Sequence, residues 1–247
     1  MGIVAHTLVK NEERFVWFAI NSVIDYVDEM RVWDNGSSDS TVKIIKSIKN
    51  SKITFKDASG VRPEVARQRM LDETKSDWIF ILDGDEIWYE PSIEYLISNI
   101  QSNIDCVVVP NYMLIGDIFH YQEEKAGRYK IAGRVGHYNI RAVKNSPGLH
   151  LEGVYPNEAF VTKDGVKVQN LPEEKILFLD KPYLHASFLK KNKYEIGEEF
   201  APDFYYPEVF FKDRPDFVPS PWRPMAVRYK LKAFFETPLK KIKRRII

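Results

Sequence analysis

The sequence of 247 residues contains one cysteine, Cys106, which cannot form an internal disulfide and therefore excludes a disulfide-stabilised scaffold. Long hydrophobic runs are also missing. The longest span about five residues, as at Trp78–Leu82, whereas a membrane-spanning helix needs about 20. The first residues show no basic segment followed by an apolar one, as a secretory signal would. Cys106 begins an apolar run, so we expect a reduced core residue and a cytoplasmic protein.

A large net charge is absent as well, since the formal charge is +1. The charge is unevenly placed. Residues 222–247 carry nine lysines and arginines and one acid, Glu236, so this tail has a charge of +8 and the remainder −7. An acidic body with one basic end is not the pattern of a nucleic-acid-binding domain, so we expect no nucleic-acid partner. With 44% hydrophobic and 29% charged residues, a disordered or collagen-like chain is excluded too.

The first 110 residues alternate between short apolar runs and segments with helical spacing. This alternation, with continuous apolar strands, predicts a parallel sheet covered by helices on both faces. The expected strands are Ile3–Val9, Met30–Trp33, Ile53–Phe55, Trp78–Leu82 and Asp105–Pro110. The expected helices are Glu12–Val27, one with Val42, Ile45 and Ile48 on its inner face, Pro63–Thr74 and Pro91–Ile100.

Beyond residue 115 this rhythm is lost. Residues 116–136 resemble a polar loop or lid, and residues 197–224 are rich in proline and aromatics, which predicts an irregular segment wrapped on the domain. Added strands are expected at Tyr138–Val143, Ala159–Thr162 and Lys175–Leu179. We expect one domain over residues 1–224, with halves at 1–110 and 111–224, followed by a separate helix over 225–247.

That last segment has apolar residues at every third or fourth position with bases between them, which is typical of a basic amphipathic helix. Pro238 is expected to kink the helix or split it in two. Three settings are open: docking on its own domain with a solvated basic face, lying on an anionic membrane surface, or an oligomer contact. The apolar positions are Val227, Leu231, Phe235, Leu239, Ile242 and Ile246.

Three acids follow predicted strands, and ligands of open parallel sheets bind at the carboxyl ends of the strands. Asp34 follows the second strand, and Asp83 and Asp85 follow the fourth. Two carboxylates two residues apart face the same side of an extended backbone and repel each other unless a divalent cation or a proton lies between them. Oxygen ligands favour Mg²⁺ or Mn²⁺. The alternative is an ordinary Asp-Gly turn.

Four blocks in order carry a more specific signal. They are Val9-Lys10-Asn11-Glu12, Asp34-Asn35-Gly36-Ser37-Ser38, Ala66-Arg67-Gln68 and Asp83-Gly84-Asp85-Glu86. Together they resemble the nucleotide-sugar half of family 2 glycosyltransferases, in the branch whose first strand ends in Val-Lys-Asn-Glu. The resemblance covers about residues 3–110 and implies the GT-A fold, an α/β domain with a mostly parallel central sheet.

The resemblance implies roles for single residues. Asp34 would bind the nucleobase and Asp83 the ribose, while Asp85 would bind a divalent metal, Mn²⁺ or Mg²⁺, together with Asp83. Arg67 would lie near the diphosphate, although Gln68 replaces the family's usual Asn and a helix-surface ion pair is the alternative for Arg67. Asn11 and Glu12 belong to the same nucleotide-sugar site. Asp39, in the loop after the second strand, caps the next helix instead.

The second half must supply the base that takes a proton from the acceptor hydroxyl. Related sequences often carry Gly-x-Val-His-Glu, with which Glu158 aligns, although Asn157 stands at the position of His. Glu152 is the competing candidate, and either acid could also be an exposed loop residue. A late histidine often returns to the metal or diphosphate, which makes His185 a candidate third ligand. His150 and His137 have weaker claims, and His6 is expected to be structural.

The resulting hypothesis is a metal-dependent glycosyltransferase that moves a sugar from a UDP- or GDP-sugar to a hydroxyl of a glycan or lipid-linked acceptor, with inversion. It would be cytoplasmic, with the basic helix allowing a peripheral position on the cytoplasmic face of a membrane. Alternatives are a non-catalytic nucleotide or glycan binder on the same scaffold and a haloacid-dehalogenase-type phosphatase, whose Asp-x-Asp normally follows the first strand. A nucleotidylyltransferase would need a glycine-rich loop after that strand, which is absent.

Overall fold

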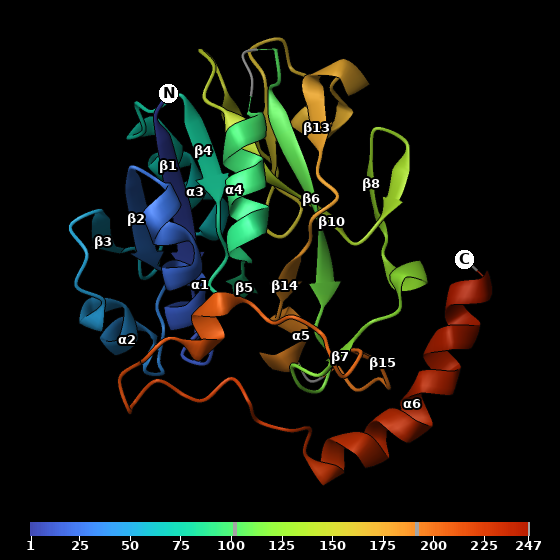
Figure 1. Ribbon diagram of the computed structural model, residues 1–247. Coiled ribbons are helices and arrows are strands. Elements are labelled where there is room, and N and C mark those ends of the chain that lie inside the picture. The colour runs from blue at the N-terminus through green and yellow to red at the C-terminus, as the bar shows by residue number, and fades with distance from the viewer. Residues whose placement is uncertain (101–102, 191–192, 247) are drawn as a thin grey trace.

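The computed structural model describes residues 1–100, 103–190 and 193–246, and it has a twisted central sheet with helices on both sides (Figure 1). The first half of the sheet is parallel, as predicted. Its strands lie in the order β3-β2-β1-β4, with helices or turns in the connections. The strands are β1 (Ile3–Val9), β2 (Glu29–Asp34), β3 (Ile53–Asp57) and β4 (Trp78–Ile81), and the helices are α1 (Val16–Val23), α2 (Thr41–Ser47), α3 (Pro63–Asp72) and α4 (Glu90–Asn99).

The second half extends this sheet with strands of both directions. The long strand β6 (Cys106–Met113) is joined to β4 through β10 (Tyr138–Lys144), which is antiparallel to both. On its other side β6 pairs in parallel with β13 (Ile176–Phe178) and then with β14 (Tyr183–His185). The short strand β5 (Glu86–Ile87) closes this edge by pairing with β14. The segment that follows the Asp-Gly-Asp motif therefore lies against β14.

Smaller elements correct two of the predictions for this half. Residues 116–136 are not a plain loop, because they contain β7, the turn η2 (Glu124–Ala126) and a hairpin of β8 and β9. The strand predicted at Ala159–Thr162 exists as β12, but it pairs with β11 in a hairpin outside the main sheet. The bounds are β7 (His120–Tyr121), β8 (Tyr129–Ile131), β9 (Arg134–Gly136), β11 (His150–Glu152), β12 (Ala159–Val161) and β15 (Glu198–Glu199), which pairs with β7.

Two helix predictions also need correction. The helix expected at Glu12–Val27 is shorter, since a turn over residues 12–15 precedes α1 and the 3-10 helix η1 (Ile24–Tyr26) follows it. Glu12 precedes the helix; its backbone N–H donates to Oγ1 of Thr41 at 2.7 Å, and its backbone oxygen accepts from the N–H of Val16 at 2.9 Å. The inner face of α2 consists of Thr41, Ile44 and Ile45 rather than a stripe through Val42 and Ile48, which are only half-buried.

Alternate residues of the central strands enter two hydrophobic clusters, one on each face of the sheet. Ala5 and Phe80 belong to the larger cluster with α1 and α4, whereas Val4 and Ile79 belong to the smaller one with Leu71 of α3. This arrangement confirms a sheet covered on both faces. Cys106 is buried and free, as expected, and burial raises the pKa of its thiol to about 12.

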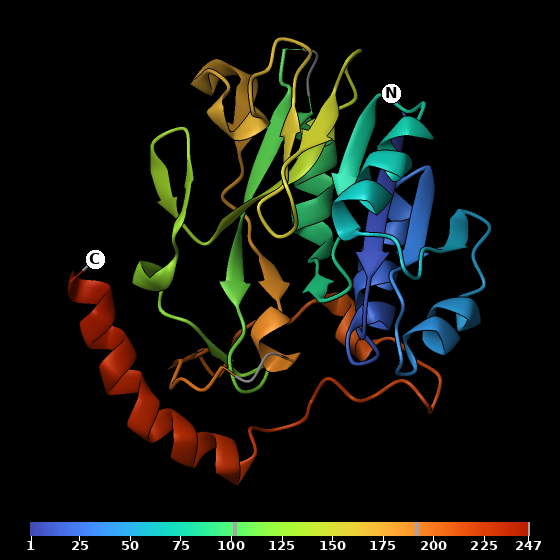
Figure 2. The ribbon, with the colours of Figure 1, turned by 180° about the vertical axis from the view of Figure 1, so that it is seen from behind.

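Residues 197–224 form an irregular segment, as predicted, with β15 and the turn η5 (Glu208–Phe211) as its regular parts. Five of its aromatic side chains pack on the larger cluster: Phe200, Phe204, Tyr206, Phe210 and Trp222. Phe200 also stacks on Tyr121, with 4.5 Å between ring centroids. The remaining short elements are α5 (Ser187–Lys190), η3 (Val168–Asn170) and η4 (Glu173–Lys175). This segment leads the chain along the lower edge of the sheet to the last helix (Figure 2).

The last helix, α6 (Val227–Ile246), runs through Pro238, so of the two expected outcomes, a kink or a split, the split is wrong. Figure 1 shows that α6 bends along its course and lies on the outside of the body. Its docked side is covered, since Ala233 and Thr237 are buried. Within the described ranges no helix has the length and apolar character needed to cross a membrane.

Candidate active site

The carboxyl ends of β1, β2 and β4 lie at one edge of the sheet, and three loops meet there. In the register of the parallel strands Val9 is opposite Asp34, and β4 lies on the other side of β1. The turn after β4 approaches β1 closely at Gly84. A Cβ at this position would lie 2.8 Å from Cγ of Glu12 and 3.0 Å from Cγ1 of Val9. A glycine is therefore needed to place the Asp-Gly-Asp motif beside the end of β1.

Asp34 is buried at the end of β2, where a tight turn surrounds its carboxylate. Its Oδ2 accepts hydrogen bonds from the backbone N–H groups of Gly36 (3.1 Å) and Ser37 (3.0 Å), and Gly36 has a φ of +83° that glycine adopts without strain. The other oxygen, Oδ1, is buried without a hydrogen-bond partner in the described part of the chain. A buried carboxylate oxygen of this kind is a place where a ligand donor can bind.

Asn11 ties the loop after β1 to the loop after β2. It adopts a positive φ of 57°, its Oδ1 accepts from the backbone N–H of Ser38 at 2.8 Å, and its own N–H donates to Oγ of Ser37 at 2.9 Å. Asp39 lies before the N-cap residue of α2, Ser40, and its Oδ1 accepts from the backbone N–H of Thr41 at 3.0 Å. Asn11 thus holds the loop that surrounds Asp34.

Asp83, the first acid of the motif, faces two arginines. Nη2 of Arg67, on α3, is 2.9 Å from Oδ1 of Asp83, and Nη2 of Arg141, on β10, is 3.4 Å from Oδ2. Burial opposes ionisation here, but the charges of Arg67 and Arg141 outweigh it and hold the pKa of the Asp83 carboxyl well below its usual range. Asp83 is therefore an anion fixed between two guanidinium groups.

Asp85, the second acid, points to a different set of partners. Its Oδ1 is 3.5 Å from Nε2 of His185, on β14, and its Oδ2 is 3.2 Å from Nζ of Lys190, on α5. The same Lys190 ammonium pairs with Glu12. Burial of the His185 ring opposes its protonation, but the hydrogen bond to Asp85 and the nearby carboxylates raise the pKa of His185. Its Nδ1 is buried without a hydrogen-bond partner among the described residues.

Glu86 lies on the buried floor of the site, where it contacts Arg141 and Tyr183. The sequence analysis assigned no role to these two residues. The Glu86 side chain is fully buried; Oε1 pairs with Arg141 and accepts a hydrogen bond from the Tyr183 hydroxyl at 3.0 Å. Arg141 also donates through Nε to that hydroxyl, at 3.1 Å. Burial raises the pKa of Glu86 to about 7. The one available signal was an arginine and an asparagine alternating within the apolar strand at residues 138–143.

The two candidate bases lie in different surroundings. Glu158, before β12, is half-buried beside Arg67 of α3, and its Oε1 is 3.5 Å from Nε of Arg67. Its Oε2 is buried and has no hydrogen-bond partner among the described residues. Glu152 is about half exposed and pairs with His150 at 3.1 Å. Glu158 thus reaches the Asp83–Arg67 pair, whereas Glu152 pairs with an exposed histidine.

A divalent cation at Asp85 would need further donor atoms close to that carboxylate. Within residues 1–100, 103–190 and 193–246, no group of three His, Cys, Asp or Glu side chains is arranged to hold a metal ion. Asp85 and His185 lie together, while Asp83 turns towards the arginines. Mg²⁺ is commonly bound by one or two protein ligands, with substrate phosphates and water supplying the others. The ammonium of Lys190 beside Asp85 and Glu12 shows that these carboxylates accept a cation, so the residues fit.

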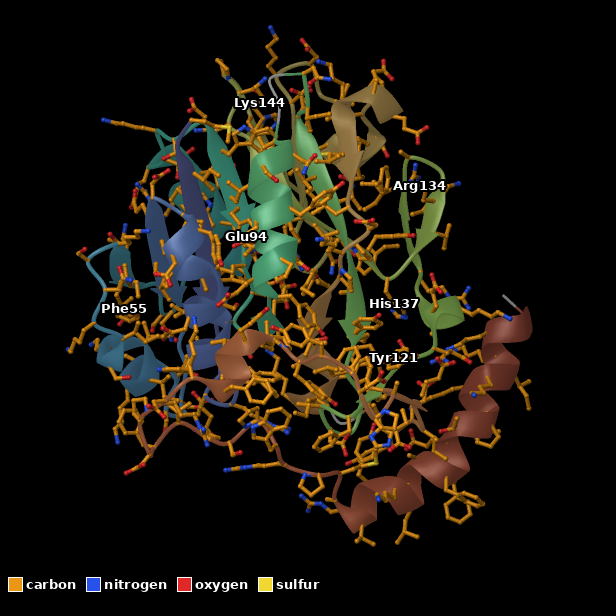
Figure 3. All side chains as sticks on the ribbon, in the orientation of Figure 1. Phe55, Glu94, Tyr121, Arg134, His137 and Lys144 are labelled. Atoms are coloured by element: carbon orange, nitrogen blue, oxygen red, sulfur yellow. The ribbon has the colours of Figure 1, made fainter. Side chains whose placement is uncertain are left out.

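The other histidines lie elsewhere. His6 is buried within β1, where its Nε2 is 2.7 Å from Oγ1 of Thr74. His137 lies between β9 and β10, on the η2 side of the sheet (Figure 3), and its Nε2 is 3.1 Å from the backbone oxygen of Glu123. The partners of both rings thus lie away from Asp83 and Asp85.

Comparison with known proteins identifies the family of the chain that carries these loops. The family model described as "Glycosyl transferase family 2" matches residues 6–151, which is more than half of the chain. The chain belongs to glycosyl transferase family 2. The matched range contains the end of β1, the Asp34 turn, Arg67 and the Asp-Gly-Asp motif, so the predicted family is confirmed.

Curated relatives of this family match over shorter segments. An uncharacterized glycosyltransferase of Rickettsia bellii is 35% identical over 102 residues, which is 39% of this chain and 33% of the relative. A glycosyltransferase of Rickettsia typhi, also described as uncharacterized, is 34% identical over 97 residues, 37% of this chain and 32% of the relative. The matched part of the chain thus spans about a third of the length of these relatives.

Solved structures of family members share the fold. The S. aureus TarS 1–349 structure is similar with a TM-score of 0.52 and 15% identity, covering 76% of this chain and 61% of TarS. The complex of the same protein with UDP-GlcNAc gives 0.52 and 15%, covering 85% and 64%. The α/β GT-A fold predicted from the sequence is therefore confirmed.

Proposed function

We propose that this family 2 protein transfers a sugar from a nucleoside-diphosphate sugar to an acceptor hydroxyl. The observation that carries the proposal is the juxtaposition of Asp83, held by Arg67 and Arg141, with Asp85 and His185 at the carboxyl edge of the sheet. Anionic and cationic groups side by side suit a ligand that has both hydroxyl donors and phosphate oxygens. In this proposal residues 1–110 form the donor half and residues 111–224 the acceptor half.

The donor is bound through the loops of the first half. The unpartnered Oδ1 of Asp34 accepts a hydrogen bond from the nucleobase, while Asn11 fixes the loop around it. Asp83 accepts from the ribose, and Arg67 lies where a diphosphate would meet a guanidinium. Glu12 shapes the floor below Gly84. The complex of TarS with UDP-GlcNAc supports a UDP-sugar as the donor, and a GDP-sugar is the alternative donor.

We propose that Asp85 and His185, with Asp83 nearby, hold Mn²⁺ or Mg²⁺ together with the donor's phosphates. Bound there, a divalent cation neutralises the negative charge that develops on the nucleoside diphosphate as it leaves. His185 offers the imidazole, and its unpartnered Nδ1 leaves room for a second contact. Arg67 adds a fixed positive charge on the same side.

The acceptor side is assigned to Glu158. Its unpartnered Oε2 takes the proton of the acceptor hydroxyl, and the oxygen attacks the anomeric carbon opposite the leaving diphosphate, which inverts the configuration. Arg67 contacts both Glu158 and Asp83, so it positions the base relative to the donor. Glu152 is the weaker candidate because it is exposed and paired with His150. A glycan or a lipid-linked molecule is the proposed acceptor.

Two other functions stay as alternatives. A non-catalytic nucleotide or glycan binder would use the same Asp34 loop without needing Glu158. A phosphatase would attack phosphorus through Asp83, but this carboxylate is paired with two arginines and follows the fourth strand rather than the first. Release of inorganic phosphate from a sugar phosphate would support the phosphatase.

Nucleotide binding tests the donor site. Thermal unfolding is measured with UDP, GDP, dTDP and CMP, each with and without Mn²⁺, for wild type, Asp85→Ala and the exposed Asp164→Ala as a matched control. A ligand at 100 times its Kd stabilises the fold by about 2.7 kcal/mol. We expect a metal-dependent shift with one diphosphate that is lost only in Asp85→Ala. Absence of a shift with every nucleotide contradicts the donor site.

Transfer from the donor so identified tests the base. Glu158→Gln should keep nucleotide binding but reduce kcat by about 100-fold or more, because a general base contributes at least that much. Glu152→Gln is the matched control and should leave kcat within about twofold of wild type. Equal loss in both variants, or loss in Glu152→Gln alone, overturns the assignment of Glu158. Donor binding without transfer to any hydroxyl favours the binder.

A further inference from the structure

Helix α6 has one face docked on the body of the protein. Ala233 and Thr237 are buried there, and Oγ1 of Thr237 accepts from the backbone N–H of Ile196 at 2.8 Å. Lys240 donates to the backbone oxygen of Tyr194 at 2.6 Å, and Arg244 forms two bonds to Glu195 at 2.6 and 2.7 Å. These contacts recur every three or four residues, so a single side of α6 faces the protein.

The opposite side of α6 is apolar and exposed. Successive residues turn by about 100° around a helix axis, which places six large apolar side chains together, away from Ala233 and Thr237. Between 55% and 73% of each of these residues is exposed. We name them the outer stripe: Val227, Leu231, Phe234, Phe235, Leu239 and Ile242. Figure 3 shows side chains of α6 projecting away from the body on this side.

Basic side chains lie along both borders of the outer stripe. By the same rotation Lys230 and Lys241 fall on one border, and Lys232 and Lys243 on the other; all four are exposed. Lys241 also approaches Glu123, at 3.6 Å. The acid of this segment, Glu236, is half-buried beside the border of Lys232 and Lys243, and it pairs with Lys240 at 2.8 Å. The two borders of the stripe thus carry four lysines against one acid, which is itself paired with a fifth lysine.

We propose that the outer stripe of α6 lies in the interface of an anionic lipid bilayer while its opposite face stays docked on the protein. Apolar side chains then enter the boundary between headgroups and acyl chains, and the lysines on both borders meet anionic headgroups. A second copy of the chain is the less favourable occupant, because a two-fold contact would bring like charges together along both borders. This inference goes beyond sugar transfer and does not depend on it.

Vesicle co-sedimentation of the full chain tests the proposal. Vesicles of phosphatidylcholine alone are compared with vesicles of equal parts phosphatidylcholine and phosphatidylglycerol. The double variant Phe235→Gln with Leu239→Gln removes the centre of the outer stripe, and Phe211→Gln is the matched control, since it is an equally exposed aromatic residue outside α6. A second double variant, Lys230→Gln with Lys243→Gln, removes one base from each border.

We expect wild type and Phe211→Gln to sediment with the anionic vesicles and to dissociate as salt is raised. The stripe variant should bind at least tenfold more weakly, and the lysine variant should lose its preference for anionic lipid. Equal binding by wild type and the stripe variant, or no binding by wild type, overturns the proposal. Analytical ultracentrifugation gives the other contrary outcome, a wild-type dimer that the stripe variant converts to monomer. Circular dichroism shows that each variant keeps its helix content.

Discussion

Lys190 carries the one cation that contacts both Asp85 and Glu12 in the described part of the chain. A divalent ion bound by Asp85 must compete with this ammonium. An ion pair of a partly exposed lysine contributes up to about 1 kcal/mol, so Lys190→Met should tighten Mn²⁺ binding about fivefold in the absence of nucleotide. Isothermal titration with Mn²⁺ measures the effect.

Lys163→Met is the control for the Lys190 experiment, because it removes the same charge at an exposed turn. Unchanged or weaker Mn²⁺ binding by Lys190→Met would mean that the ammonium does not compete for Asp85. In that case Lys190 acts towards the diphosphate instead, and nucleotide binding should weaken in the same variant.

His6 predicts part of the pH dependence of stability. Burial within β1 lowers the pKa of His6 to about 3, so the folded protein keeps it neutral at a pH where the unfolded chain protonates it. The stability that depends on the neutral ring is present above a pH of about 6.5 and is lost as the pH falls below it. Between pH 7 and pH 5 this loss is about 2 kcal/mol.

His6→Gln checks this sign, since a glutamine can still bond to Thr74 and does not titrate. The free energy of unfolding from urea titrations at pH 7 and pH 5 should fall by about 2 kcal/mol more for wild type than for the variant. Parallel losses in the two proteins would assign the acid sensitivity to other groups.

At the scale of elements, the hairpin of β11 and β12 carries Glu158 on a loop that bends sharply at Gly153. Gly153 has a φ of +96°, and a Cβ there would lie 2.9 Å from the backbone oxygen of Asn157 and 3.2 Å from Cα of Glu158. Gly153→Ala therefore strains the backbone and also displaces the proposed base. We expect kcat to fall about tenfold or more, since small displacements of a catalytic group are costly.

Gly165→Ala is the matched control, because Gly165 also has a positive φ, +77°, but a Cβ there would meet no atom within 4 Å. Both variants should lose about 1 kcal/mol of stability from the strained backbone. Only Gly153→Ala should also have a lower kcat. Steady-state kinetics with thermal unfolding separates the two effects, and equal kcat in the two variants would remove Glu158 from the reaction.

The elements that the sequence predicted well are those whose signal is local. The strand Ile3–Val9 is indicated by an apolar run, and the helix Pro63–Asp72 by a proline at its start. Both elements lie within two residues of the predicted bounds. Strand β5 has two residues, and its partner β14 is almost 100 residues away, so no local pattern reveals it. The direction of β10 and the separate position of β12 also depend on distant partners.

The same division holds for the candidate site. Asp34, Asp83 and Asp85 are predictable because each follows an apolar strand whose carboxyl end forms the site edge. Arg141 is not, because its role comes from Asp83 and Glu86, which are 58 and 55 residues away in sequence. An arginine in an apolar strand indicates a buried partner, but the sequence does not identify it.

At the scale of the whole molecule, an ion pair between residues far apart in sequence holds the end of α6 on the body. Arg244 donates to both oxygens of Glu195, at 2.6 and 2.7 Å, and to Glu123 at 3.0 Å. Glu195 is buried, and its other side-chain hydrogen bond is to Gln122 at 3.0 Å. Removing Arg244 leaves the carboxylate of Glu195 buried without its cation. In a fully buried pair this lowers the free energy of unfolding by several kcal/mol. Because Arg244 is partly exposed, we expect a loss of about 2 kcal/mol here.

We therefore expect Arg244→Ala to release the end of α6 without unfolding the sheet. Amide hydrogen exchange should accelerate across residues 227–244 and stay slow in β1, β4 and β6, because helix docking opens locally while the core strands open only with the whole domain. Lys243→Ala, an exposed neighbour, is the matched control and should exchange as wild type does. Faster exchange in β6 as well would show that α6 and the sheet unfold together, whereas unchanged exchange in α6 would show that Thr237 and Ala233 hold the helix without the ion pair.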